Sequence, residues 1–347
     1  MKIIDLRSDT VTKPSAAMKR AMFIAPLGDD VIGDDPTVNK LQIETAKLLG
    51  KQAGLYVPSG TMGNQIALKT LTQPGDEVVL DHESHIFRYE VAGAAVMSGL
   101  QFHTISGPGG IMTAEQVREA IRPADIHQPQ TTVVCLENTH NRAGGVIYPL
   151  DEIKKISALC KKHKIKMHLD GARLWNASIA SGVGLKEYSK YFDSVMVCFS
   201  KGLGCPAGSV LVGDKEFIEK ARRNRKMMGG GMRQAGILAG AGLYALKHNL
   251  KRMAEDHKRA QTLAQTISQI PKIRIDLASV QTNIVVFDIK QTGMRSEQAM
   301  EILAGKGLWL VSFGPTRLRA VTHLDVNDKD IENAGAIVKK TFGGRNK

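Results

Sequence analysis

The stretch IKMHLDGARLW, residues 165–175, decides the fold together with the run SVMVCFSKGLG, residues 194–204. Each begins as a nearly continuous apolar run and ends in polar or glycine-rich residues. Strands that are apolar throughout are typical of a parallel sheet that helices cover on both faces. Ligands of such open sheets bind beyond the carboxyl ends of the strands. The two runs therefore predict buried strands with Asp170 and Lys201 at a ligand-binding edge.

Apolar runs alternate with helical patterns through the first two-thirds of the chain. We expect strands at residues 55–58, 77–81, 101–105, 131–137, 165–170, 194–199 and 209–212. We expect helices at residues 38–49, 61–71, 114–121, 151–163 and 214–225. This alternation predicts crossover units, and hence an α/β protein with a mostly parallel sheet.

The last third reads as a separate unit. A long helical stretch over residues 236–270 leads to expected strands at 283–289, 309–312 and 318–322 and helices at 296–304 and 328–341. We therefore predict an N-terminal arm at residues 1–20, outside the sheet, a large domain at 21–245, and a smaller α+β domain at 246–347.

Composition limits the classes of protein that the chain could belong to. Apolar residues make up 43% and charged residues 23%, as in ordinary globular proteins. The four cysteines show no metal-ligand spacing, and Cys135 and Cys198 lie in apolar runs, which suits a reducing compartment. No signal peptide or membrane-length apolar run is present. We expect a cytoplasmic protein without a metal site or a membrane partner.

The net charge of +13 allows a second hypothesis, a basic nucleic-acid-binding protein. The densest basic cluster is KARRNRK, residues 220–226. It contains no aromatic residue, and aromatics are only 5% of the chain. A solvated or oligomer-facing surface is the favoured interpretation, so we expect no nucleic-acid partner.

Three features together indicate a pyridoxal phosphate site. The turn SGTMGN, residues 59–64, opens an expected helix, where Gly60 and Thr61 could bind a phosphate. Asp170 could face a pyridine nitrogen and keep it protonated. Lys201, 31 residues later, could form a Schiff base. Each has a purely structural alternative: a tight turn, a helix N-cap and a surface charge.

Further polar residues are candidates for the same site. Arg173 could contact the ring oxygen or a substrate group, or simply pair with Asp170. Arg319 suits capture of a substrate carboxylate, or an inter-domain salt bridge. His85 could stack on a planar cofactor or move protons, and His127 also lies at a loop position.

The chain resembles the low-specificity L-threonine aldolases, which are aspartate-aminotransferase-like, fold-type-I pyridoxal enzymes. The resemblance covers nearly the whole chain in the family's motif order: LRSDTVTKPS, GDDVIGDDPTVNKLQ, PSGTMGN, HIFRYE, LENTHNRAGG, HLDGARLWNA, SKGLGCPAGS, GGGMRQAG and LRAVTH. It implies reversible cleavage of L-threonine or L-allo-threonine to glycine and acetaldehyde. It also implies active sites at a subunit boundary, often in a homotetramer.

The resemblance assigns roles to individual residues. Lys201 resembles the Schiff-base lysine, Asp170 the pyridinium partner, and His85 the histidine stacked on the ring. The other implied members are Gly60 and Thr61 at the phosphate, Arg173 near the ring oxygen, Ser8 and Arg319 at the substrate carboxylate, His127 as a second active-site histidine, and Lys226 and Arg233 at a neighbouring subunit's phosphate.

Two positions depart from the family pattern. Ile32 stands where the family often has tyrosine, which could alter substrate range, and Cys205 stands where alanine is usual. Another fold-type-I lyase, either a phenylserine-type aldolase or a β-eliminating lyase, remains an alternative. The base that removes the β-hydroxyl proton is left open among His85, His127 and water.

Overall fold

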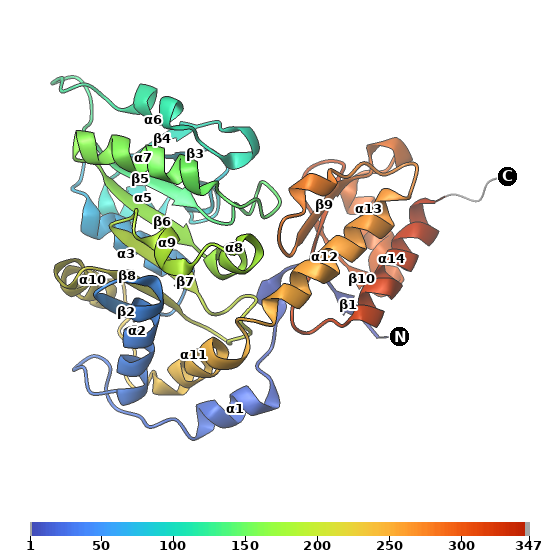
Figure 1. Ribbon diagram of the computed structural model, residues 1–347, viewed down its shortest axis with the longest axis horizontal. Coiled ribbons are helices and arrows are strands. Elements are labelled where there is room, and N and C mark those ends of the chain that lie inside the picture. The colour runs from blue at the N-terminus through green and yellow to red at the C-terminus, as the bar shows by residue number, and fades with distance from the viewer. Residues whose placement is uncertain (1, 344–347) are drawn as a thin grey trace.

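The computed structural model describes residues 2–343, and a seven-stranded sheet forms the middle of its larger, N-terminal unit (Figure 1). The strand order is β2-β8-β7-β6-β5-β3-β4. The strands are β2 (Ala53–Val57), β3 (Glu77–Asp81), β4 (Gln101–Ile105), β5 (Thr131–Glu137), β6 (Lys166–Gly171), β7 (Ser194–Cys198) and β8 (Ser209–Gly213). β3 to β7 are parallel, and β8 is antiparallel to β7 and β2. The predicted mostly parallel sheet is confirmed, with strand ends within two residues of expectation.

Alternate side chains of these strands enter different cores. Val79, Val134 and Leu136 pack into one cluster, with residues of α2 (Pro36–Leu49), α6 (Ala114–Ala120) and α7 (Leu150–His163). Val78 and Val133 point the other way, into clusters that include residues of α3 (Gly60–Leu71). Since successive side chains of a strand alternate between the faces, both faces of the sheet are buried. This accounts for the continuous apolar runs in the sequence.

Several helices of this region were not expected. They are α1 (Ala16–Phe23), α4 (His85–Arg88), α5 (Gly93–Ser98), α8 (Leu174–Ser181), α9 (Leu185–Ser189) and the short 3-10 helix η1 (Asp9–Val11). All of them have eight residues or fewer, too short for a clear helical period. The expected helix at residues 214–225 is α10 (Lys215–Met227), capped by Asp214.

The long helical stretch expected at residues 236–270 is two helices, α11 (Gly236–His248) and α12 (Met253–Ser268). Asn249 ends α11, and its side-chain amide donates to the Leu203 carbonyl at 2.8 Å. Asparagine often bonds to backbone groups in this way instead of continuing a helix. The break therefore ties α11 to the turn that follows Lys201.

A second hydrophobic core lies in the C-terminal region. Its antiparallel sheet has the order β11-β12-β9, with β9 (Ile284–Asp288), β11 (Val311–Ser312) and β12 (Arg317–Val321). α12, α13 (Ser296–Gly305) and α14 (Asp328–Phe342) pack around it (Figure 1). This unit agrees with the predicted smaller α+β domain, although its boundary at residue 246 stays a prediction and residues 344–347 lie outside the described part.

The first residues join this second unit instead of standing free. β1 (Ile4–Asp5) pairs with β10 (Leu308–Trp309), and Ile4 and Leu6 enter the C-terminal core. The first residues thus lie outside the main seven-stranded sheet, as expected, but β1 forms a separate two-stranded sheet with β10, which the sequence did not indicate. The apolar Ile3–Ile4 pair precedes charged residues and was too short to indicate a strand. From β1 the chain continues to the carboxyl edge of the main sheet, where Thr12 donates to the Lys201 carbonyl at 2.9 Å.

No helix among residues 2–343 combines the length and the apolar character needed to cross a bilayer.

Candidate active site

The predicted cofactor residues meet at one edge of the sheet. Asp170 is the penultimate residue of β6, Lys201 follows β7, and Gly60 opens α3 after β2. β2 is antiparallel to β8, which is antiparallel to β7, so β2, β6 and β7 end at the same edge. The strand topology thus brings together residues that are more than 100 positions apart in the chain.

Lys201 lies partly buried in a fixed turn. Its carbonyl accepts from the Thr12 hydroxyl at 2.9 Å and from the Gly204 N–H at 2.8 Å. Gly204 has φ +77°, a conformation that glycine adopts without strain. The backbone at Lys201 is therefore held from two sides, which would fix the position of a lysine that binds a cofactor.

Asp170 is a buried carboxylate bonded to neutral donors. Its Oδ1 accepts from the Ala172 N–H and its Oδ2 from Asn64 Nδ2, each at 3.0 Å. It is not an N-cap, because α8 begins at Leu174 with Arg173 in the cap position. None of the positive side chains in the described residues forms a salt bridge with it. Asp170 is thus an anion that a cationic ring nitrogen could complement.

The amino terminus of α3 supplies the expected phosphate donors. Ser59 caps the helix by accepting from the Met62 N–H at 3.1 Å, so Gly60 and Thr61 carry the first backbone N–H groups of the helix. A Cβ on Gly60 would lie 2.7 Å from Cys198 Sγ on β7. Glycine is therefore required here because helix and strand approach closely.

Arg173 is held by a residue that the sequence had not singled out. Its Nη2 and Nε donate to the two carboxylate oxygens of Asp9 at 2.7 and 2.8 Å, and both side chains are buried. Burial disfavours the Asp9 anion, but the guanidinium outweighs burial and holds the pKa of Asp9 well below its usual range. The alternative in which Arg173 pairs with Asp170 was wrong.

Arg319 has spare hydrogen-bonding capacity. Its Nη1 donates to Asn141 Oδ1 at 2.9 Å and its Nη2 to the Arg7 carbonyl at 3.1 Å, while its buried Nε has no partner among the described residues. Burial, and then the nearby Arg173 cation, lower the pKa of Arg319 to about 10. A guanidinium without an acidic partner suits a carboxylate from a substrate.

His85 lies among three acidic groups. Its Nδ1 is 2.9 Å from Glu90 Oε1, and its backbone N–H donates to Glu137 Oε2 at 2.7 Å. Burial lowers the pKa of His85, but Glu90, Asp170 and Glu137 together raise it above the usual value. His85, Glu90 and Asp170 place potential metal ligands within 4.8 Å of one another, although the His85–Glu90 hydrogen bond already uses two of them.

Glu137 also positions the loop that follows β5. Its Oε1 accepts from the Asn141 N–H at 2.9 Å, and Asn141 Oδ1 accepts from both Arg319 and Arg173. One buried carboxylate therefore fixes His85 on one side and the acceptor of both arginines on the other.

The remaining predicted residues lie apart from this cluster or at its margin. His127 is exposed in the loop before β5, at the amino edge of the sheet, so one chain does not bring it to Lys201. Ser8 is partly buried beside Asp9 and accepts from the Thr10 N–H. Arg233 pairs with Asp29 at 2.8 Å, and Lys226 is exposed.

The glycine turn between Lys226 and Arg233 nevertheless lies close to the phosphate donors. A Cβ on Gly230 would clash with Met62, in the first turn of α3. Part of the basic cluster is structural: Arg225 is buried against Asp30 at 2.7 Å, and Arg222 donates to the Asp30 and Val31 carbonyls. These contacts fix the loop that carries Ile32, which is exposed.

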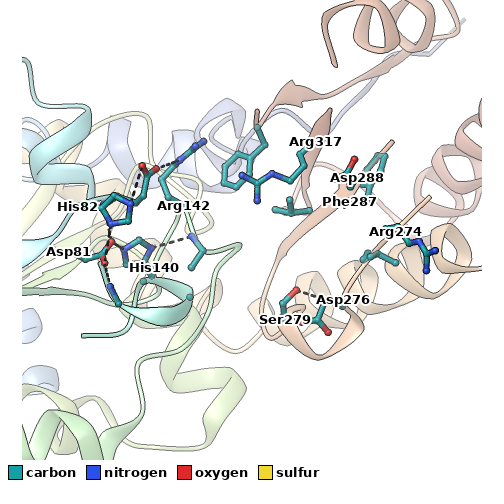
Figure 2. A pocket seen from close by; sticks show the side chains of 18 residues that line it. Asp81, His82, His140, Arg142, Arg274, Asp276, Ser279, Phe287, Asp288 and Arg317 are labelled. Carbon is teal, nitrogen blue, oxygen red and sulfur yellow. Dashed lines mark hydrogen bonds and ion pairs between the residues drawn. The ribbon is translucent and has the colours of Figure 1, made fainter. Parts of the chain in front are cut away.

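A cleft of about 610 Å³ lies next to the site, between the two units (Figure 2). Arg142 crosses its rim: its Nε donates to Glu83 at 2.9 Å, and its guanidinium lies 4.2 Å from the Phe313 ring centroid. Arg319 also lies over the Phe313 ring, with its guanidinium carbon 5.6 Å from the ring centroid. The cleft therefore shares Phe313 with Arg319, the candidate carboxylate ligand, although Arg319 does not line it.

Comparison with known proteins identifies the family of the chain. Residues 5–290 match the family model described as beta-eliminating lyase. A probable low-specificity L-threonine aldolase 2 of Arabidopsis thaliana is 42% identical over 99% of this chain and 98% of its own length. The low specificity L-threonine aldolase of Escherichia coli K12 is 42% identical over 96% of this chain and 98% of its own.

Solved structures show the same fold. A Leishmania major threonine aldolase superposes with a TM-score of 0.83 at 20% identity, covering 97% of this chain and 99% of that one. A putative L-allo-threonine aldolase from Listeria monocytogenes gives 0.78 at 22% identity, over 94% and 93%. The fold is thus that of the fold-type-I pyridoxal enzymes, as predicted. With the sequence relatives, the chain belongs to the beta-eliminating lyase family, among the low-specificity L-threonine aldolases.

Proposed function

We propose that this chain is a pyridoxal-phosphate-dependent carbon–carbon lyase that cleaves L-threonine and L-allo-threonine to glycine and acetaldehyde. The observation that carries the proposal is the convergence of Lys201, Asp170, the first turn of α3 and Arg319 at one edge. The names of the sequence relatives support the same reaction.

The donor set fits pyridoxal phosphate at three separate points. Lys201 would hold the cofactor through its amine, the buried Asp170 carboxylate would meet the pyridine nitrogen, and the N–H groups of Gly60 and Thr61 would bind the phosphate. When bound, the cofactor supplies an electron sink for the bond that breaks at the substrate Cα. Arg173, fixed by Asp9, would lie near the ring.

The remaining groups would bind and orient the amino acid. Arg319 has a free, buried Nε for the carboxylate, and Ser8 would add a hydroxyl. Holding the carboxylate at a fixed place decides which bond at Cα is broken. A base must also take the β-hydroxyl proton, and His85, His127 and a bound water are the candidates.

His127 would contribute only across a subunit boundary. Its loop is exposed at the amino edge of the sheet, and Ile126 beside it is 96% exposed. Phe23, Val91 and Val96 are also mostly exposed, which is typical of surfaces that another protein copy covers. We propose a cytoplasmic homotetramer in which His127, Lys226 and Arg233 serve neighbouring active sites.

The proposal is tested by the visible absorption of the purified protein before and after borohydride. We expect a yellow protein whose band disappears on reduction and is absent from Lys201→Ala. Lys220→Ala, at an exposed lysine paired with Glu216, is the control and should stay yellow. A colourless protein that cannot be reconstituted would overturn the proposal.

The products then identify the reaction. Glycine and acetaldehyde from L-threonine or L-allo-threonine would support the aldolase, and both products should be lost in Lys201→Ala. Pyruvate and ammonia from a β-substituted amino acid, without glycine, would instead indicate a β-eliminating lyase.

A further inference from the structure

Glu90 is a carboxylate without solvent exposure, and three side chains donate to it. His85 Nδ1 and Asn64 Nδ2 each lie 2.9 Å from Oε1, and Gln65 Nε2 lies 2.6 Å from Oε2. Burying a carboxylate is costly unless a positive group compensates it. Asn64 and Gln65 are neutral amides, so His85 is the one bonded partner that can carry the compensating charge.

The orientation of Asn64 is fixed by its other partners. Asn64 Oδ1 lies 3.1 Å from His168 Nε2, and His168 Nδ1 lies 2.8 Å from the Ser194 hydroxyl. Burial lowers the pKa of His168 to about 4, so this ring is neutral and donates to Asn64. The Asn64 NH₂ group is thereby directed at two carboxylates, Glu90 at 2.9 Å and Asp170 at 3.0 Å.

We propose that Glu90 is a positioning residue that holds the His85 imidazole by its Nδ1–H and leaves Nε2 for the ligand side. Through the shared Asn64 amide, Glu90 and Asp170 form one hydrogen-bonded unit. That Nε2 faces a pyridine ring rests on the proposed function, whereas the His85–Glu90 contact does not depend on it.

The groups around His85 come from several elements. Glu90 lies in the loop between α4 and α5, Asp170 lies next to the last residue of β6, and Glu137 ends β5. The Tyr89 ring lies 5.6 Å away, centroid to centroid. Among these groups Glu90 is the one that hydrogen-bonds to the ring itself, so it fixes which ring nitrogen keeps its proton.

The test uses the cofactor-free full chain, so that its result is independent of catalysis. Nitrogen-15 NMR of labelled histidines reports which ring nitrogen carries the proton, and His85→Asn identifies the His85 signals. We expect a protonated Nδ1 in the wild type. In Glu90→Gln the pKa of His85 should fall by roughly one unit or more, because an anion is removed at hydrogen-bond distance.

Glu77→Gln is a matched control. Glu77 is also buried, accepts from Arg122, and lies 3.4 Å from His103 Nδ1, but at the amino end of β3. The Glu77→Gln variant should change the free energy of unfolding and leave the His85 NMR signals unchanged. An unchanged His85 titration in a folded Glu90→Gln protein would overturn the proposal. If that variant does not fold, the wild type still decides, because a bare Nδ1 with the proton on Nε2 would refute it.

Reconstituted enzyme gives a second readout. A loss of about one pKa unit at His85 corresponds to roughly a tenfold effect where the reaction needs the protonated ring. We expect this loss in kcat, with a displaced pH profile and an unchanged KM for the amino acid. If neither the wild type nor any variant binds pyridoxal phosphate, the proposed function is wrong. The NMR result on the His85–Glu90 contact would still hold, because it is measured without the cofactor.

Discussion

Replacing Asp9 by asparagine should destabilise the protein far more than its position near the chain terminus suggests. Asp9 is fully buried, binds Arg173 through both oxygens at 2.7 and 2.8 Å, and also lies 3.4 Å from Asn283 Nδ2. Removing one partner of a buried ion pair leaves the other charge uncompensated and costs roughly 3–5 kcal/mol. We expect a loss of that size in the free energy of unfolding at pH 7.

Urea unfolding of the cofactor-free protein measures this loss, with Asp5→Asn as the control. Asp5 pairs with Arg7 at 2.7 Å near the surface, and such exposed pairs contribute about 1 kcal/mol or less. The pKa of Asp9 lies below its unfolded value, so its contribution is present above about pH 4 and is lost as the pH falls toward the folded pKa. Equal losses for Asp9→Asn and Asp5→Asn at pH 7 would refute the reasoning.

Three other changes have definite expected results. Lysine cannot make the forked contacts of the Arg319 guanidinium, so Arg319→Lys should raise KM for the amino acid at least about tenfold in steady-state kinetics. An unchanged KM would contradict the proposal that Arg319 binds the substrate carboxylate. His168 is buried and its pKa is lowered to about 4, so the free energy of unfolding should fall by roughly 3 kcal/mol as the pH falls from about 6.5 to 4. In His168→Gln, urea unfolding at several pH values should show a weaker dependence of stability on pH. A dependence as steep as that of the wild type would exclude His168 as its cause. Gly60→Ala places a Cβ 2.7 Å from Cys198 Sγ and should weaken cofactor binding measured by equilibrium titration, while the added change Cys198→Ala should restore it if the clash is the cause.

The sheet was predictable because its strands are buried on both faces. The bounds of β3 and β5 were predicted to the residue, because a short apolar run such as VVCLE is typical of a strand that is buried on both faces. Helices of four to eight residues gave no usable period, and the break at Asn249 depends on an acceptor, the Leu203 carbonyl, that only the folded chain brings near. The sequence pattern predicts elements that are long and amphipathic or wholly buried. It does not predict a helix end that depends on a single tertiary contact.

The candidate site was predicted in its outline and missed in its connections. Asp170, Lys201 and Gly60 follow from the rule that ligands bind at the carboxyl ends of strands. Asp9, Glu90 and Asn141 stood inside the quoted motifs, yet their partners lie up to 274 positions away, as for Asp9 and Asn283. The spacing of residues within a motif does not predict contacts with residues so far away in the chain. The role of His127 stays a prediction of the resemblance, and the fold adds that its exposed loop lies at the amino edge of the sheet, away from the Lys201 edge of the same chain.

The charged side chains of the site that lack a partner of opposite charge indicate which charges a ligand should carry. Asp9 is matched by Arg173 and Glu90 by His85, while Glu137 accepts from two backbone N–H groups. Within residues 2–343 this leaves Asp170 with neutral donors, and Arg319 with a free Nε and no acidic partner. A buried anion and a buried cation without a bonded partner of opposite charge are costly, so a ligand that brings a cation to one and an anion to the other should stabilise the folded protein as well as react in it. A protonated pyridine nitrogen and an amino-acid carboxylate carry these two charges.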